Sequence, residues 1–262
     1  DSVYVEFPYG GNMLMDGGTG GGEDWDSGRN TVLPFLRQKG IQALDAIILT
    51  HPDIDHVGGL ASVLEGLKVR YVFDNGAESD TYAYRHFSRE VSENRMAAGR
   101  RFILRRGDSI EGVKGVSILC LNPPAAWAKD PSVSINDMSL ALKIGFGRSA
   151  MLFCGDIGEK AISEVMLSPP PLLKSGLIML PHHGEKLSPG AEAFIDSVRP
   201  IYAVISQGMA AREVSRSEDT QSLLSAKGIK VFRTNDGGAV FAAADDKGLS
   251  VDNFAPRDKI SR

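Results

Sequence analysis

The sequence predicts an α/β fold, and three observations lead to that prediction. Short apolar runs of strand length alternate with segments whose apolar residues recur at helical spacing. The run Ala46-Ile47-Ile48-Leu49 is continuously apolar, as expected of a central strand covered on both faces. No repeat, low-complexity tract or Ser/Pro-rich linker divides the chain. We therefore expect a single domain over residues 1–262.

The first half of the chain begins with a predicted hairpin. Residues 3–7 alternate like a strand, a Pro-Tyr-Gly-Gly-Asn turn follows, and residues 13–15 return as its partner. A glycine-rich loop over residues 17–28 precedes an amphipathic helix, 31–39, which ends at Gly40. The remaining elements are strand 46–49, a helix on Leu60, Val63, Leu64 and Leu67, strand 69–73 and a helix over 79–98.

The second half continues this alternation. Apolar runs predict strands at 118–121, 140–144 and 150–154, and a helix follows at 159–167. Three consecutive prolines, 169–171, then break the chain. The remaining elements are strand 176–180, helix 191–198, strand 202–206, helix 221–227, and strands 230–232 and 239–242.

Composition and charge exclude several classes of protein. The chain is 42% hydrophobic and 24% charged, which excludes a largely disordered chain. Its net charge of −4 gives no general attraction to nucleic acid or anionic membranes. No apolar run approaches the roughly 18–20 residues of a membrane span, so we expect no membrane insertion by this segment. Cys120 and Cys154 are far apart, which predicts buried free thiols and no disulfide.

Four of the five histidines lie in two short clusters, each directly after an apolar strand. The first is the segment His51-Pro52-Asp53-Ile54-Asp55-His56, and the second is the pair His182-His183. Residues just past the carboxyl ends of buried strands lie at the sheet edge where ligands bind. One aspartate could simply cap the next helix, but two histidines and two aspartates within six residues favour metal binding.

A third polar site, Gly155-Asp156, follows another strand. Taken alone, Asp156 is more typical of a helix cap or turn, and one of the two adjacent histidines could be a core residue. Together the three loops offer donors for two divalent ions bridged by a carboxylate and a hydroxide, an arrangement used for in-line hydrolysis. The candidate donors are His51, Asp53, Asp55, His56, Asp156 and one or both of His182 and His183.

The segment Thr50-His51-Pro52-Asp53-Ile54-Asp55-His56-Val57-Gly58-Gly59 resembles the signature of the metallo-β-lactamase superfamily. More narrowly, the chain resembles the C-terminal metallo-β-lactamase-like domain of ComEC-type DNA-uptake channel proteins. The resemblance implies a four-layer αβ/βα sandwich, with two mixed sheets face to face and helices outside. Besides the signature, its matching pieces are DS at 1–2 with the following strand, LMDGG at 14–18, GDS at 107–109, NPP at 122–124, NDMSL at 136–140, FCGDI at 153–157, LPHHG at 180–184 and NDGGA at 235–239.

The resemblance also implies roles for the candidate donors. Asp55 or the bridging Asp156 would orient a metal-activated hydroxide, and His183 would assist the leaving group or position substrate. Asp55 and His183 are therefore the expected catalytic residues, although His182 and His183 could exchange roles. The implied ligands are His51 and Asp53 for one ion, Asp55, His56 and His182 for the other, and Asp156 as the bridge.

The chain departs from the superfamily pattern in two places. Asp53 stands where most members have a histidine, and Asn136-Asp137 occupies a region where a further histidine is usual. Oxygen donors favour Mn²⁺ or Mg²⁺ relative to a nitrogen-rich zinc site. We therefore expect two divalent ions, Mn²⁺ or Zn²⁺ with Mg²⁺ as a further candidate, and weaker binding at the first site. Asn136, Asp137 and Asp16 are candidates to contact substrate or support the ligands, although Asp16 is also typical of a turn.

Seven arginines fall within residues 85–106, and Arg85 and Arg89 share one face of the predicted helix. With nearby aromatic rings, they could follow the phosphates of a nucleic acid. The alternative is a solvated helix on which arginines pair with Glu90 and Glu93, and the residues alone slightly favour it. The resemblance favours DNA, because the similar domain is thought to degrade the non-transported strand.

Three functions are open on this basis. The first, which we prefer, is a metal-dependent nuclease or phosphodiesterase that cleaves DNA, single-stranded by expectation, during DNA uptake. The second is a metallo-hydrolase of a small ester, lactone or phosphodiester. The third is a degenerate, non-catalytic module that binds DNA or a partner.

The expected context follows from the first residue and from the resemblance. The chain begins at Asp1 and not at methionine, so we expect an excised domain or a processed product. The resemblance implies a soluble segment of a larger membrane protein, with the membrane channel of the same parent as its partner. It places that segment on the outer face of the cytoplasmic membrane, extracellular or periplasmic.

Overall fold

The computed structural model describes residues 1–21, 25–94, 97–208, 211–245 and 247–254, with only the backbone of residues 211–216. The chain divides into two compact units, each with its own sheet. Unit 1 comprises Asp1–Asp108, Gly112–Lys114 and Pro123–Leu140, and unit 2 comprises Ser109–Glu111, Gly115–Asn122 and Ala141–Arg262. The expected single domain over residues 1–262 therefore stays a prediction.

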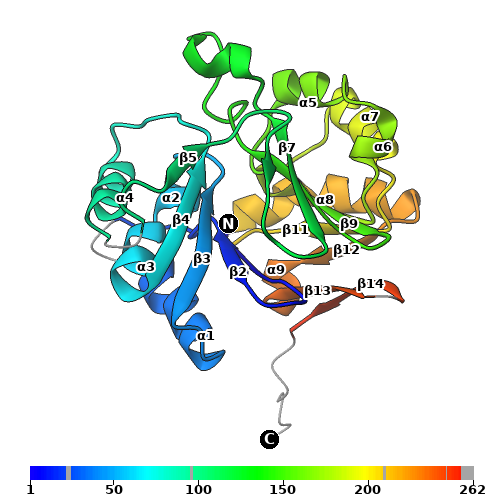
Figure 1. Cartoon of the computed structure of the whole chain (residues 1–262). Helices are drawn as coiled ribbons and strands as arrows, with labels where there is room; N and C mark the ends of the chain where they lie inside the picture. Colours follow the sequence, from blue (N-terminus) through cyan, green and yellow to red (C-terminus); the bar gives the residue numbers. More distant parts are fainter. Residues whose placement is uncertain (22–24, 95–96, 209–210, 246, 255–262) are drawn as a thin grey trace, which may run out of the picture. The chain divides into compact units, whose positions relative to one another are not determined.

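Unit 1 contains a five-stranded mixed sheet. Its strands are β1 (Val3–Glu6), β2 (Asn12–Met15), β3 (Ala43–Leu49), β4 (Lys68–Asp74) and β5 (Arg101–Ile103). They lie side by side in sequence order, as Figure 1 shows. β1 and β2 form the predicted antiparallel hairpin, and β2 to β5 are parallel. The loops after β2, β3 and β4 therefore emerge at one edge of the sheet.

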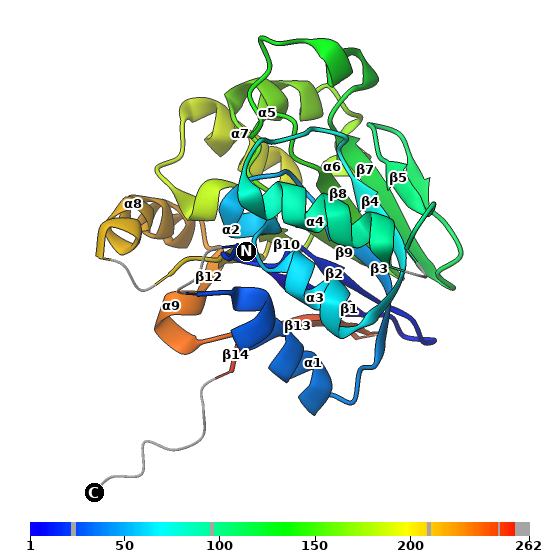
Figure 2. The same ribbon diagram turned by 90° about the vertical axis from the view of Figure 1, so that its left-hand side faces the viewer.

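Helices of unit 1 cover one face of this sheet. The helical segments are η1 (Gly28–Val32, a π-helical turn), α1 (Leu33–Gln38), α2 (Ile54–Val57), α3 (Leu60–Gly66), α4 (Tyr82–Glu93) and η2 (Ala125–Lys129). α1, α3 and α4 lie on one face of the strands (Figure 2). In the core between them, Leu36, Ile47 and Phe87 are completely buried. Thr81 caps the start of α4, because its side chain accepts a hydrogen bond from the Tyr84 backbone N–H.

Unit 2 contains a seven-stranded mixed sheet and a separate hairpin. The strands are β6 (Ser109–Ile110), β7 (Val116–Asn122), β8 (Ala141–Phe146), β9 (Ser149–Phe153), β10 (Leu177–Met179), β11 (Tyr202–Ile205) and β12 (Lys230–Arg233). The order is β12-β11-β10-β9-β8-β7-β6, with β9 to β12 parallel and β6 to β9 antiparallel. Hairpin β13 (Val240–Asp245) and β14 (Gly248–Asn253) packs Val251 against Leu177, Val204 and Phe232 of this sheet.

The helical segments of unit 2 are α5 (Glu159–Val165), α6 (Pro170–Leu173), η3 (His182–Gly184), α7 (Pro189–Val198), α8 (Ala211–Ala226) and α9 (Thr234–Gly237). α7 starts where the Ser188 side chain accepts the Ala191 N–H, with Pro189 in the first turn. α6 likewise starts within the three prolines, where a proline loses no helical hydrogen bond.

The structure confirms the α/β class and most predicted elements, with a few differences. α8 begins ten residues before the predicted helix 221–227. The sequence did not predict this earlier start, because residues 211–220 lack regularly spaced apolar side chains. The short strands β5 and β6 and the final strand β14 were not predicted. Cys120 and Cys154 are buried and free, as predicted. Across the residues that the structure describes, every helix is too short or too polar to cross a bilayer.

Candidate metal centre

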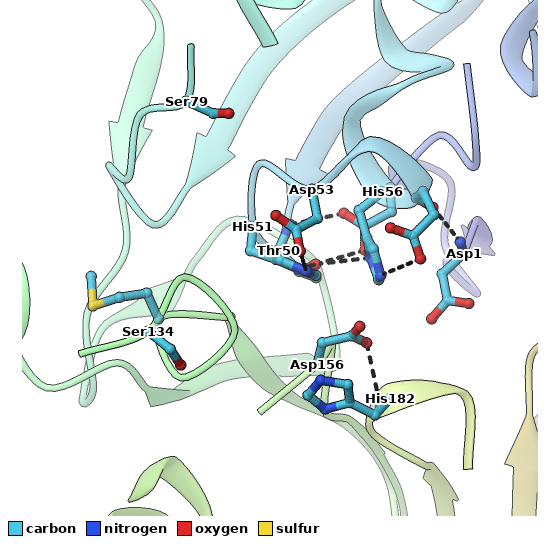
Figure 3. A network of polar contacts seen from close by, with 12 residues as sticks. Asp1, Thr50, His51, Asp53, His56, Ser79, Ser134, Asp156 and His182 are labelled. Atoms are coloured by element: carbon cyan, nitrogen blue, oxygen red, sulfur yellow. Dashed lines mark hydrogen bonds and ion pairs between the residues drawn. The ribbon is translucent and has the colours of Figure 1, made fainter. Parts of the chain in front are cut away.

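The loop after β3 carries the first group of candidate ligands, and helix α2 begins within it at Ile54. His51 and His56 are completely buried, and their ring centroids lie 4.1 Å apart (Figure 3). The side chains of Asp53 and Asp55 are each 42% exposed. The loop therefore places two imidazoles in the interior and two carboxylates closer to solvent.

Within this loop, each imidazole faces one carboxylate. His51 Nε2 lies 3.7 Å from Asp53 Oδ2, and His56 Nε2 lies 3.8 Å from Asp55 Oδ2. Two donors bound at about 2.0–2.2 Å to one tetrahedral ion lie roughly 3.3–3.6 Å apart, close to both separations. His51 Nε2 is buried and has no hydrogen-bond partner within the described part of the chain. A divalent ion fits these donors, because a buried imidazole nitrogen normally has a partner.

Asp16 and Thr50 support the two imidazoles from behind. β2 and β3 are parallel neighbours with Met15 opposite Ile48, so the residues that follow the two strands come side by side. Asp16 Oδ2 lies 2.8 Å from His56 Nδ1 and accepts the Thr50 hydroxyl at 2.7 Å. Asp16 Oδ1 accepts the Thr50 backbone N–H at 2.8 Å. Asp16 therefore links the end of β2 to the ligand loop.

This network keeps the Asp16 carboxyl ionised. Burial alone would raise the pKa of Asp16, but the His56 ring and the Thr50 N–H outweigh burial and lower it. An ionised carboxylate can only accept, so Nδ1 of His56 carries a proton and Nε2 is the ring nitrogen left to bind a metal. The Thr50 hydroxyl also lies 3.1 Å from Nδ1 of His51. The sequence interpretation gave Thr50 no role, although a hydroxyl directly before the first histidine was the available signal.

The turn after His56 packs backbone against backbone on the glycine-rich loop. The Gly17 N–H donates to the His56 carbonyl at 2.7 Å. A Cβ on Gly59 would lie 2.2 Å from the Gly17 carbonyl oxygen, and a Cβ on Gly58 would lie 2.1 Å from the Gly20 nitrogen. The backbone conformation does not require glycine here, since φ of Gly58 and Gly59 is −54° and −85° and suits any residue. The close approach of the two backbones is what excludes a side chain. The glycine-rich loop thus supports the ligand loop.

Unit 2 carries the second group of candidate ligands on the loops after β9 and β10. Asp156 is 5% exposed, and its Oδ1 accepts the His182 backbone N–H at 3.2 Å (Figure 3). His183 Nε2 lies 3.7 Å from Asp156 Oδ2, and His183 Nδ1 lies 2.9 Å from the Ser206 carbonyl oxygen. A carbonyl can only accept, so Nδ1 of His183 carries the proton and Nε2 faces the carboxylate. Both histidines therefore contact Asp156, His182 through its backbone and His183 through its ring.

Strand order and backbone conformation together position this second group. β9, β10 and β11 are parallel neighbours, so Asp156, the two histidines and Ser206 follow adjacent strand ends. His182 and His183 have φ of 50° and 52°, in the left-handed region that costs other residues roughly 1–2 kcal/mol relative to glycine. Such strain is concentrated at functional sites.

Asn136 and Asp137 lie in a turn of unit 1. The Ser134 hydroxyl donates to Asp137 Oδ2 at 2.7 Å and accepts the Asp137 N–H at 3.0 Å. The segment after the turn lies beside the ligand loop, because the Leu140 N–H donates to the Thr50 carbonyl at 3.0 Å. Asp137 is therefore engaged within its own turn, and a substrate contact by Asn136 or Asp137 stays a prediction.

Helix α4 carries Arg85 and Arg89 beside a surface hollow of about 600 Å³ within unit 1. Three serines and the acidic Glu78 and Asp80 also line the hollow. Arg89 pairs with Glu90 at 3.2 Å, as the solvated-helix alternative expects, whereas Arg85 has no ion pair with any described residue. Two further arginines of this segment have structural contacts, since Arg101 donates to Asp74 and Arg105 donates to the Asn75 carbonyl. Arg95 lies outside the described residues.

Comparison with known proteins shows which family the chain resembles. Residues 1–111 match the model of the metallo-beta-lactamase superfamily. The chain is 33% identical to ComE operon protein 3 of Bacillus subtilis, covering 92% of this chain and 31% of that protein. It is 26% identical to competence protein ComA of Neisseria gonorrhoeae, covering 87% of this chain and 29% of that protein. The chain thus spans less than a third of these relatives.

A solved structure has the same fold at low sequence identity. CmlA, a diiron β-hydroxylase from Streptomyces venezuelae, superposes with a TM-score of 0.55 at 12% identity, covering 88% of this chain and 51% of CmlA. This likeness concerns the fold alone. The family-model match and the matches to competence proteins confirm the predicted resemblance to the metallo-β-lactamase superfamily and to ComEC-type competence proteins.

Proposed function

We propose that the chain is a metal-dependent hydrolase that cleaves phosphodiester bonds of DNA, single-stranded by preference. The observation that carries this proposal is the ligand loop after β3, where two buried imidazoles each face a carboxylate oxygen at 3.7–3.8 Å. A role in capping the next helix would need only one side chain. This loop instead supplies two pairs of potential metal ligands, each an imidazole nitrogen and a carboxylate oxygen. The superfamily match supports the same reading.

Two divalent ions are proposed, Mn²⁺ or Zn²⁺ with Mg²⁺ as a further candidate. Asp156 is assigned as the bridging carboxylate. The Asp53 carboxylate in place of an imidazole favours Mn²⁺ at the first ion, because harder oxygen donors suit that metal. The proposed ligands are His51 and Asp53 for the first ion, and Asp55, His56 and His182 for the second.

A bound divalent ion supplies a Lewis acid and activates water near neutral pH. Around it, the side chains hold protons at defined atoms. Asp16 keeps the proton of His56 on Nδ1, which fixes the ring for coordination through Nε2. Asp55 orients the attacking water, and His183, whose Nδ1 donates to the Ser206 carbonyl, would accept a proton of that water on Nε2 and pass it to the leaving oxygen.

DNA is the proposed substrate for two reasons. The relatives that match most of this chain include a competence protein and ComE operon protein 3. Arg85 also lies at the hollow on α4 without an ion pair to any described residue, next to serine hydroxyls that can contact phosphate. Arg85 and Arg89 are therefore the proposed contacts with the DNA backbone. The proposed setting is the outer face of the cytoplasmic membrane, beside the channel part of a larger parent protein.

The test is cleavage of plasmid and linear single-stranded DNA with Mn²⁺, Mg²⁺ or Zn²⁺. Wild type is compared with Asp55→Ala and with Asp196→Ala, which removes an exposed carboxylate on α7 that pairs with Lys227. We expect cleavage by wild type and Asp196→Ala, and a loss of more than about 100-fold in Asp55→Ala, since even residues behind a metal ligand contribute 10–100-fold.

Two results would favour the other functions. Hydrolysis of a small ester, lactone or phosphodiester without DNA cleavage would indicate a small-molecule hydrolase. DNA binding without any hydrolysis would indicate a non-catalytic module. Either outcome would contradict the proposed nuclease.

A further inference from the structure

Helices α3 and α4 bring together a third group of metal-binding side chains, outside both groups of candidate ligands. Glu65 lies near the end of α3, and His86 and Glu90 stand four residues apart on α4. His86 Nε2 lies 3.1 Å from Glu65 Oε1 and 3.5 Å from Glu90 Oε1. All three donor atoms lie within 4.8 Å of one another, and all three residues belong to unit 1.

We propose that Glu65, His86 and Glu90 form a zinc site that links α3 to α4. One imidazole nitrogen and two carboxylate oxygens are donors that Zn²⁺ accepts in tetrahedral sites. The separations of 3.1 and 3.5 Å are close to the roughly 3.3–3.6 Å expected between ligands of one such ion. His86 and Glu90 are 15% and 16% exposed, whereas Glu65 is 43% exposed, so the site opens to solvent on one side for a water ligand.

Two arginines border this site without closing it. Arg29 lies 4.0 Å from Glu65 Oε2, and Arg89 lies 3.2 Å from Glu90 Oε1. Their side chains are 68% and 56% exposed, so they can turn toward solvent when an ion takes the carboxylates. Without a metal, a protonated His86 would form ion pairs with the same two carboxylates. Zinc analysis distinguishes a metal site from such ion pairs.

The place of the site gives it a structural consequence. α3 begins at Leu60, directly after the Gly58-Gly59 turn that follows the ligand loop. An ion shared by α3 and α4 would therefore hold the helix after the ligand loop against the helix that carries Arg85. The proposal uses none of the residues assigned to hydrolysis, so it stands or fails independently of the proposed function.

The test is zinc content after equilibrium dialysis of the whole chain at pH 7.5, followed by removal of free metal. Wild type is compared with His86→Asn and with Glu93→Gln, which changes an exposed carboxylate of α4 outside the cluster. We expect wild type and Glu93→Gln to hold one zinc equivalent more than His86→Asn. At zinc about 100-fold above the Kd, the zinc-induced rise in Tm should be roughly 5–10 °C smaller in His86→Asn.

Glu65→Gln should lose the same equivalent, and it supplies the test should His86→Asn fail to fold. Asp55→Ala should keep this equivalent while losing DNA cleavage, which separates the zinc site from the proposed nuclease. Equal zinc content in wild type, His86→Asn and Glu65→Gln would overturn the proposal. A difference in Tm that persists unchanged in EDTA, with equal zinc content, would show an ordinary ion pair.

Discussion

The two groups of candidate ligands are held in different ways, although both follow parallel strands. In unit 1, the buried carboxylate of Asp16 contacts His56 and Thr50 and fixes the ligand loop through side chains. In unit 2, Asp156 and His183 are held by backbone groups, the His182 N–H and the Ser206 carbonyl. We infer that a buried carboxylate side chain orients the His56 ring in the first group, whereas a backbone carbonyl orients the His183 ring in the second.

The largest effect is expected from Gly59→Ala, because the added Cβ would lie 2.2 Å from the Gly17 carbonyl oxygen. Two backbones would have to separate, so we expect a loss of about 3 kcal/mol or more in the free energy of unfolding. The measurement is urea unfolding followed by circular dichroism, in EDTA. The matched control in unit 2 is Gly190→Ala on α7, where the nearest atom is 3.8 Å away and helix propensity predicts a gain of up to about 1 kcal/mol. Similar losses in the two variants would refute the close-packing argument.

The next largest effect is expected from Asp16→Asn. The amide keeps the shape but loses the charge that holds the His56 proton on Nδ1, so we expect metal affinity to fall about 10–100-fold. Isothermal titration with Mn²⁺ and Zn²⁺ measures this change. In unit 2, Ser206→Ala keeps the carbonyl that accepts from His183 and should leave affinity unchanged. An unchanged affinity in Asp16→Asn, or a comparable loss in Ser206→Ala, would remove the contrast between side-chain and backbone support.

A smaller effect is expected at His182, where φ is 50°. Both His182→Gly and His182→Ala remove the ring and should reduce metal affinity equally. Because glycine adopts this conformation without strain, we expect His182→Gly to be more stable than His182→Ala by roughly 1 kcal/mol. The two free energies of unfolding, measured without metal, test this. Equal stability would mean that the left-handed conformation stores no strain in unit 2.

The contrast also explains what the sequence could and could not predict. The ligand loop was recognised because four metal-binding side chains fall within six residues after an apolar strand, a density that turns and caps do not need. The contacts that support this loop were harder to predict, because Asp16 and Thr50 are distant in sequence. They meet only because β2 pairs with β3 in a register that sets Met15 opposite Ile48.

In unit 2 the difficulty was conformational. The sequence places His182 and His183 together but does not predict that both adopt positive φ, which decides where each ring points. The prediction assigned His183 to proton transfer, and the structure shows its ring 3.7 Å from Asp156 with Nδ1 at the Ser206 carbonyl. The start of α8 was missed for another reason, since a helix without apolar periodicity leaves no pattern to detect.

The smallest effect is expected from Arg85→Ala, which tests whether unit 1 also carries the DNA-binding surface. One phosphate contact on single-stranded DNA contributes about 0.7 to the slope of log K against log salt, so Arg85→Ala should reduce this slope by about that amount. Arg89→Ala should change it less, because Glu90 at 3.2 Å competes for the guanidinium. Fluorescence anisotropy with a labelled oligonucleotide in EDTA measures binding without cleavage. Lys186→Ala removes an 80% exposed cation of unit 2 and should leave the slope unchanged. A larger change in Lys186→Ala than in Arg85→Ala would move the DNA-binding surface to unit 2, beside the strained histidines.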